Sequence, residues 1–247
     1  QEVLKAHLRR LDEVNPKINA VVQQTSSIAM EQAEKIDKKV KNNEELGMLA
    51  GVPVTVKVNI DQKNYATTNG ARVNQHNIAK EDSPIVKNFI NADAIIIGRT
   101  NAPAFSLRWF TSNEFHGGTL NPHNFLLTPG GSSGGASAAV AAGICPIAHG
   151  TDIAGSIRYP AYACGIHGIR PSFGKLPTYN ATTGDRYIGG QLMAVSGPLA
   201  RTVDDLRIAL DVLSKRDLRD PWYISEAKVD EDFKQTVAIS PFPNDMP

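Results

Sequence analysis

The sequence is short of cysteine and of excess charge, and each shortage excludes a class of protein. Its two cysteines, Cys145 and Cys164, are too few for a disulfide framework and lack the CxxC spacing of metal and redox motifs. We therefore expect two buried thiols. The 26 Lys and Arg residues against 25 Asp and Glu residues leave a net charge of +1, which offers no broad electrostatic field to nucleic acid or to an anionic membrane.

Long apolar runs are missing as well. No run of about 18 apolar residues is present, so we expect no transmembrane helix. Nothing near Gln1 has the basic-then-apolar layout of a signal peptide. The first residue is not Met, which predicts a processed or truncated N-terminus and leaves export open, and we expect a cytoplasmic protein.

What is present is enough apolar material for a real core: 41% of the 247 residues are hydrophobic, which suits one large domain or two small ones. Helical patterns are predicted over residues 2–14, ended by Asn15-Pro16, and over 27–42, 83–92 with Ser83 as N-cap, 136–143, and 202–214 with Thr202 as N-cap. Strand patterns cover 18–23, 51–60, 93–101, 144–152, 191–197 and 236–240. The alternation of strands and helices predicts an α/β core with parallel strands.

The stretch "TPGGSSGGASAAVAAG", residues 128–143, is open to three interpretations. A phosphate-binding loop would need the closing Gly-Lys-Ser/Thr of the P-loop, which is absent. A nucleophile elbow would make Ser133 the attacking residue, because residues 131–135 match G-x-S-x-G. That motif requires a preceding strand and a marked downstream histidine, and neither His149 nor His167 stands out.

The third interpretation couples this stretch to "GTDIAGSIRYPAYACG", residues 150–165, where a strand ends before a turn and Ser156. Backbone N–H groups at such a turn can surround an oxyanion. The candidate donors are Ile153, Ala154, Gly155 and Ser156. A serine needs a base, and desolvation lowers the pKa of a lysine on an apolar strand, as Lys57 is. From the residues alone, a lysine on an edge strand that extends to water is the favoured interpretation of Lys57.

The two segments together, "GGSSGGASAAVAAG" and "GTDIAGSIRYPAYACGIHGIRPSFGKLP", resemble the signature region of the amidase signature family, serine hydrolases that use a Ser-Ser-Lys triad. The resemblance extends through "GVPVTVKVNI", "IIIGRTNAPAFS", "NPHN" and "GPLARTVDDLRIAL", and so covers most of the chain. It implies that Ser156 is the nucleophile, Lys57 the base and Ser132 the relay. It also implies a cis peptide bond between Gly131 and Ser132.

The same resemblance implies roles for the residues around the triad. The backbone N–H groups of Ile153, Ala154, Gly155 and Ser156 are expected to form the oxyanion hole. Ser133, Asp152 and Arg158 are expected to support the site, Asp152 and Arg158 by pairing with each other or by binding loop carbonyls. Two positions depart from the usual family pattern: Val58 replaces an Asp after the lysine, and Ala154-Gly155 replaces Gly-Gly.

The expected fold is a single amidase-signature domain over residues 1–247, with a mixed β-sheet covered by helices on both faces and an incomplete C-terminus. The expected function is hydrolysis of a small carboxylic amide through a covalent acyl-enzyme, with no metal and no cofactor. Two alternatives stay open: the amidase-like subunit of a glutamine-dependent amidotransferase, and an inactive truncated remnant. We expect a small-molecule amide as the partner, no nucleic acid and no membrane, with a homodimer or a complementing C-terminal segment as further partners.

Overall fold

The computed structural model describes residues 1–183 and 188–224, except the side chain of residue 191. In these residues a six-stranded sheet has the order β1-β3-β2-β6-β8-β7. Its strands are β1 Val21–Gln24, β2 Pro53–Lys57, β3 Ile95–Thr100, β6 Ile147–Asp152, β7 His167–Gly168 and β8 Val195–Ala200. β3, β2 and β6 run parallel, and β1, β8 and β7 are antiparallel to their neighbours. The predicted mixed sheet is therefore confirmed.

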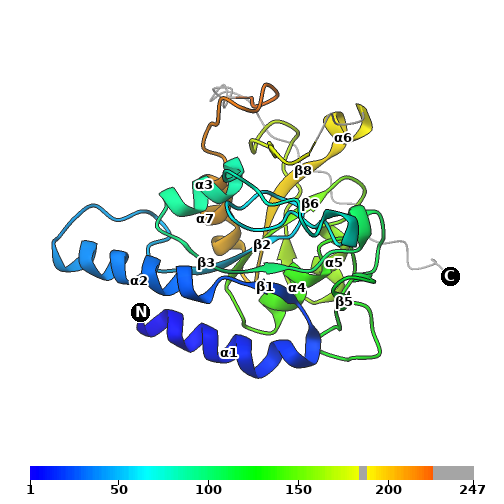
Figure 1. The fold of residues 1–247 in the computed structure, drawn as a ribbon, viewed down its shortest axis with the longest axis horizontal. Coiled ribbons are helices and arrows are strands. Elements are labelled where there is room, and N and C mark those ends of the chain that lie inside the picture. The colour runs from blue at the N-terminus through cyan, green and yellow to red at the C-terminus, as the bar shows by residue number, and fades with distance from the viewer. Residues whose placement is uncertain (184–187, 225–247) are drawn as a thin grey trace, which may run out of the picture.

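Helices cover both faces of this sheet, as predicted (Figure 1). One face is covered by α1 Glu2–Ile18, α2 Ser26–Lys41, α4 Gly134–Ala141 and α5 Arg158–Ala163. The other is covered by α3 Pro84–Asn91 and α7 Val203–Leu213. Side chains alternate between the two layers along each strand, so that Ile95 and Ile97 of β3 join the first core and Ile96 the second.

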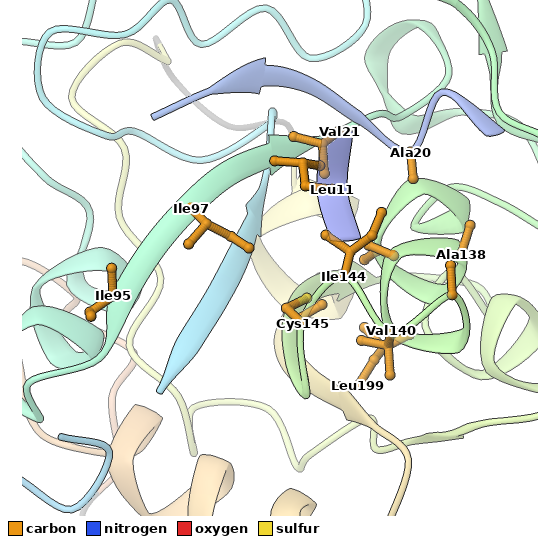
Figure 2. Close-up of a cluster of buried hydrophobic side chains, with 14 of the residues drawn as sticks. Leu11, Ala20, Val21, Ile95, Ile97, Ala138, Val140, Ile144, Cys145 and Leu199 are labelled. Carbon is orange, nitrogen blue, oxygen red and sulfur yellow. The ribbon is translucent and has the colours of Figure 1, made fainter. Parts of the chain in front are cut away.

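The first core depends on the small side chains of α4. Figure 2 shows Val140 of this helix beside Leu199, and Ala138 and Ile144 belong to the same core cluster. The residues of α4 from Gly134 to Val140 are all buried, because the helix lies between the sheet and the other helices of that face. The alanine-rich sequence that follows the Gly/Ser loop, residues 130–133, thus forms a helix that is buried in all but its last residue. Both cysteines are free and buried, as expected.

The remaining elements are short. They are 3-10 turns at Arg72–Asn74 and Ala104–Ser106, a small hairpin of β4 Ser112–Asn113 and β5 Gly117–Gly118, and α6 Ile188–Met193. No helix in residues 1–183 or 188–224 has the length and apolar character needed to cross a membrane.

Two sequence predictions about element boundaries were wrong. The first helix does not end at Asn15-Pro16 but continues through Pro16 to Ile18. Burial of Ile18 in the first core outweighs the local cost of the proline, and Asn15 accepts hydrogen bonds from the N–H groups of Ala20 and Val21, at 2.9 and 2.8 Å.

The second error concerns residues 191–197, which were predicted as one strand. Residues 188–193 form α6, and β8 begins only at Val195, where its pairing with Asp152 of β6 starts. Pairing with β6 therefore decides where this strand begins. Thr202 caps α7 as predicted, accepting a hydrogen bond from the N–H of Asp205, whereas Ser83 makes no side-chain cap. The predicted strand at 236–240 lies outside the described residues.

The sheet topology brings the chemistry-bearing residues to one edge. Lys57 is the last residue of β2 and Asp152 the last residue of β6. Because β2 and β6 are parallel neighbours, their carboxyl ends lie at the same edge of the sheet, where ligand sites of α/β proteins commonly form.

Candidate active site

Lys57 is completely buried and lies on a central strand, between β3 and β6. The interpretation of Lys57 as an edge-strand lysine that extends to water is therefore wrong, because the sheet continues on both sides of β2. Burial lowers the pKa of Lys57 from 10.5 to about 7, and the charge of Asp152 opposes this shift only partly. Near neutral pH a large fraction of Lys57 is thus a neutral amine, which can accept a proton.

The Nζ atom of Lys57 faces hydroxyl groups. It lies 2.7 Å from Ser132 Oγ, 2.9 Å from Thr151 Oγ1 and 3.1 Å from Ser133 Oγ. Within the described part of the chain no carboxylate forms a salt bridge with Lys57. The lysine is therefore held by neutral dipoles, which stabilise its charged form less than an opposite charge would.

The Gly/Ser loop lies against Lys57 just before α4 begins. Its Gly131–Ser132 peptide bond is cis, as the family resemblance implied. A Cβ atom on Gly131 would lie 2.6 Å from backbone atoms of Arg108 and Phe110, so only glycine lets the two backbones approach this closely. The loop also reaches the predicted nucleophile, because the N–H of Ser133 donates to the carbonyl oxygen of Ser156 at 3.1 Å.

Ser156 lies on the turn between β6 and α5. The turn passes through Gly155, whose φ of 106° is a conformation that favours glycine. Ser156 is buried except for 5% of its surface, and it lines a pocket together with Ser132. Both serines belong to the described residues, and no hydrogen bond joins Ser132 Oγ to Ser156 Oγ there. Lys57 and Ser132 thus form a direct hydrogen bond, whereas Ser132 and Ser156 have in common only the pocket that both of them line.

The four predicted oxyanion donors differ in their hydrogen bonds. The N–H of Gly155 donates to Asp152 Oδ1 at 2.8 Å. The N–H groups of Ile153, Ala154 and Ser156 have no hydrogen-bond partner in residues 1–183 and 188–224. Three of the four predicted donors therefore have no partner among the described residues, and the fourth is occupied by a carboxylate.

Asp152 organises this turn through both of its carboxylate oxygens. It accepts hydrogen bonds from the N–H groups of Gly155 and Ile157 and from the guanidinium of Arg158, at 2.8 to 3.1 Å. Burial alone would raise the pKa of Asp152, but these hydrogen bonds outweigh it and lower the pKa to about 2. The predicted pairing of Asp152 with Arg158 is confirmed. The sequence did not indicate a second cation, Arg170, whose Nε lies 3.7 Å from Asp152 Oδ1.

His149 is buried, but within the described residues neither of its ring nitrogens hydrogen-bonds to the Gly/Ser loop. Its Nε2 lies 3.1 Å from Ser196 Oγ, and its Nδ1 accepts a long hydrogen bond of 3.5 Å from the backbone N–H of Lys57. Burial and the neighbouring Lys57 lower the pKa of His149 to about 3, so the ring stays neutral. The hydroxyl of Ser133 hydrogen-bonds to Lys57 and Thr151 instead, so the geometry that a Ser133 nucleophile elbow would need is not present at this histidine.

The pocket lined by Ser132 and Ser156 has a volume of about 460 Å³. Residues 178–183 include several that line this pocket. Hydrogen bonds connect them to the segment after β2, which carries Asp61. This buried carboxylate accepts hydrogen bonds from Thr67 Oγ1 at 2.6 Å and from the N–H of Thr182 at 2.9 Å. The side chain of Asn180 bonds to the N–H of Asp61 and to the carbonyl of Asn59. These hydrogen bonds join residues about 120 positions apart, and no local sequence pattern predicts them.

Comparisons with known proteins agree with this geometry. The family model described as Amidase matches residues 2–243. An indoleacetamide hydrolase from Bradyrhizobium diazoefficiens is 47% identical over 99% of this chain and 47% of its own length. A glutamyl-tRNA(Gln) amidotransferase subunit from Fusobacterium nucleatum is 37% identical over 87% of this chain and 43% of its own length.

Among solved structures, a bacterial aryl acylamidase of the amidase signature family superposes with a TM-score of 0.83. It is 35% identical and is matched over 90% of this chain and 46% of its own length. The chain therefore spans about half the length of the relatives it matches. Because the family model covers nearly the whole sequence and the fold agrees with a solved member, this chain belongs to the amidase family.

Proposed function

We propose that this chain carries the catalytic residues of an amidase that hydrolyses a small carboxylic amide through a covalent acyl-enzyme. The observation that carries the proposal is the 2.7 Å contact between Ser132 Oγ and the buried amine of Lys57, beside the pocket that also holds Ser156. A neutral amine next to a hydroxyl is the arrangement that activates a serine when no histidine is available.

In the proposed acylation step, Ser156 Oγ attacks the amide carbonyl carbon. The proton of Ser156 passes to Ser132 Oγ as the proton of Ser132 passes to Lys57 Nζ. The Ser132–Ser156 hydrogen bond closes when substrate is bound, since catalytic hydrogen bonds are often made only in the substrate complex. Reversal of the relay protonates the leaving nitrogen as the C–N bond breaks, which releases ammonia or an amine and leaves an ester on Ser156.

The negative charge of the tetrahedral intermediate develops on the former carbonyl oxygen. The N–H groups of Ile153, Ala154 and Ser156 are proposed to stabilise it, because they are unpaired in the described residues and belong to the turn that carries the nucleophile. Asp152 keeps this turn in place and occupies the N–H of Gly155. Water then attacks the acyl-enzyme by the same relay and releases the carboxylic acid.

Indole-3-acetamide is the first substrate to test, because the indoleacetamide hydrolase is similar along 99% of this chain. The second candidate function is that of a glutamine-dependent amidotransferase component, which the 37% identity to the Fusobacterium nucleatum protein favours. The two differ in substrate: the first predicts ammonia release from indole-3-acetamide, and the second predicts ammonia release from glutamine.

The deciding experiment uses a fluorophosphonate serine-hydrolase probe, with intact mass and peptide mapping, on the wild type and on Ser156→Ala, Ser132→Ala and Ser133→Ala. We expect one adduct on Ser156, labelled much more slowly in Ser132→Ala and absent in Ser156→Ala. An adduct on Ser133 would overturn the assignment in favour of the nucleophile elbow. A folded wild type that neither labels nor releases ammonia from either substrate would instead identify an inactive remnant.

A further inference from the structure

We propose that Asn59 and Thr151 are positioning residues: together they hold one N–H of Lys57, so that the lone pair of its neutral amine points at Ser132. The inference rests on the proposed function, because a lone pair matters only if Lys57 acts as a base. It adds two residues to the site that the sequence analysis did not single out. Asn59 lies two residues after Lys57 and Thr151 on the neighbouring strand β6, and both line the pocket.

The neutral form of Lys57 can make only a limited number of hydrogen bonds. A neutral amine has two N–H donors and one lone pair. Its Nζ has three hydroxyl oxygens within hydrogen-bond distance in the described residues, those of Ser132, Ser133 and Thr151. One of the three hydroxyls must therefore donate to the lone pair, and the other two must accept N–H groups.

Ser133 has its own proton already committed. Its hydroxyl donates to the backbone carbonyl of Thr151 at 3.2 Å and accepts the N–H of Thr151 at 3.2 Å. Toward Lys57 the Ser133 oxygen can then act only as an acceptor. Ser133 thus takes one of the two N–H groups of the neutral amine.

The remaining choice is whether Thr151 or Ser132 donates its proton to the lone pair of Lys57. The Nδ2 of Asn59 donates to Thr151 Oγ1 at 2.9 Å, the same distance at which Lys57 Nζ lies from that oxygen. Asn59 fills one lone pair of this hydroxyl oxygen, and we assign the other to an N–H of Lys57, so that the proton of Thr151 points away from the amine. The lone pair of Lys57 is then left for Ser132, the shortest of the three contacts.

Other titratable groups near Lys57 do not compete for this lone pair. The charge that acts on Lys57 comes from Asp152, whose carboxylate is paired with Arg158, and His149 is neutral. Both groups lie on β6. The orientation of the amine therefore depends on the hydroxyls that surround it.

The test is Thr151→Val, which removes the hydroxyl with little change in shape, beside Thr151→Ser, which restores it. The matched control is Thr55→Val, because Thr55 is also fully buried, lies on the strand of Lys57 and has a side chain that hydrogen-bonds, within the described residues, only to Cys145 Sγ. We expect Thr151→Val to lower kcat about 10- to 100-fold, as misplaced catalytic groups do, with KM nearly unchanged. Thr151→Ser should stay within about threefold of the wild type, and Asn59→Leu should fall between the two, because it removes the donor to Thr151 Oγ1 and leaves the hydroxyl in place.

The pH profile separates positioning from simple damage. Thr151→Val removes an acceptor that binds the ammonium form more strongly than the amine, so the acid limb of kcat/KM should move to lower pH while the plateau falls. A structural defect would lower the plateau without moving the limb. Wild-type kcat and profile in Thr151→Val, or a Thr151→Ser variant as impaired as the valine, would overturn the proposal.

A measurement without turnover keeps the inference separate from the proposed function. The Nζ resonance of Lys57 is followed by ¹⁵N NMR against pH in the wild type, Thr151→Val and Thr55→Val. A lower titration midpoint in Thr151→Val alone supports the positioning role, even if the protein fails to hydrolyse any amide tested. An unchanged midpoint in Thr151→Val overturns it, whatever the catalytic outcome.

Discussion

Lys57 and Asp152 end two neighbouring parallel strands, yet the surroundings of Asp152 stabilise its charged form and those of Lys57 favour its neutral form. Both are buried. Around Asp152 the turn supplies backbone N–H groups and Arg158, which lower the pKa to about 2 and keep the carboxylate charged. Around Lys57 the Gly/Ser loop and β6 supply only hydroxyl groups, and burial lowers the pKa to about 7.

This contrast separates a group that supports the site from a group that can react in it. A charge that is fully compensated by fixed donors, as that of Asp152 is, contributes rigidity and has no reason to exchange a proton near neutral pH. A charge that is left uncompensated exchanges its proton easily, and the cost of burying it is borne by the surrounding fold. Three predictions test this contrast.

The largest effect is expected for Lys57→Arg. A guanidinium remains charged at any working pH, so this variant keeps the cation and removes the base. We expect kcat/KM, measured with whichever amide the wild type hydrolyses, to fall by a factor of about 10³ or more, within the range of general-base catalysis. Steady-state ammonia release measures the loss, and circular dichroism checks the fold. An active Lys57→Arg would break the contrast, because the neutral form would then be unnecessary.

The pH dependence of the wild type comes next. The base must be deprotonated, so kcat/KM should rise with pH up to about 7, the pKa of Lys57, and level off above it. Between pH 7 and pH 5 we expect a fall of about 100-fold, tenfold for each pH unit below the pKa of a single essential base. Initial rates at constant ionic strength provide the profile. A flat profile between pH 5 and pH 8 would contradict the assignment.

The smallest of the three effects is expected for Asp152→Asn. The amide keeps the shape and loses the charge, so we expect a loss of about 3 to 5 kcal/mol in the free energy of unfolding, as when a buried charged partner is removed, with about tenfold lower kcat/KM. Urea denaturation measures the first quantity. The folded-state pKa of about 2 lies below the usual 3.8, so this stability is present above pH 4 and is lost as the pH falls toward 2.

Arg158→Gln is the matched control for Asp152→Asn. The Arg158 side chain is more than half exposed, and Asp152 keeps its backbone donors and Arg170 without it. We expect a loss near 1 kcal/mol or less, since exposed ion pairs contribute little. A loss as large as that of Asp152→Asn would show that the backbone donors are not what stabilises the carboxylate.

Much of the molecule could be predicted from local patterns. The β-branched runs at 51–60 and 93–101 and the amphipathic pattern at 202–214 all form the elements expected. The proposed roles of Lys57, Ser132 and Ser156 came from the family resemblance. The errors lie where tertiary contacts override local preference, at Pro16 inside the first helix and at Val195, where pairing with β6 sets the start of a strand.

The sequence by itself determined most of the longer strands and helices and the Gly-Ser-rich loop that leads into a helix, because periodicity and backbone freedom act within a few residues. Only the tertiary structure decided that Lys57 lies on a central strand, that Asn59 and Thr151 meet at its amine, and that Asp61 holds Thr182. Desolvation and hydrogen bonding depend on every group packed around an atom, and those groups come from segments about 75 to 120 residues apart in the chain.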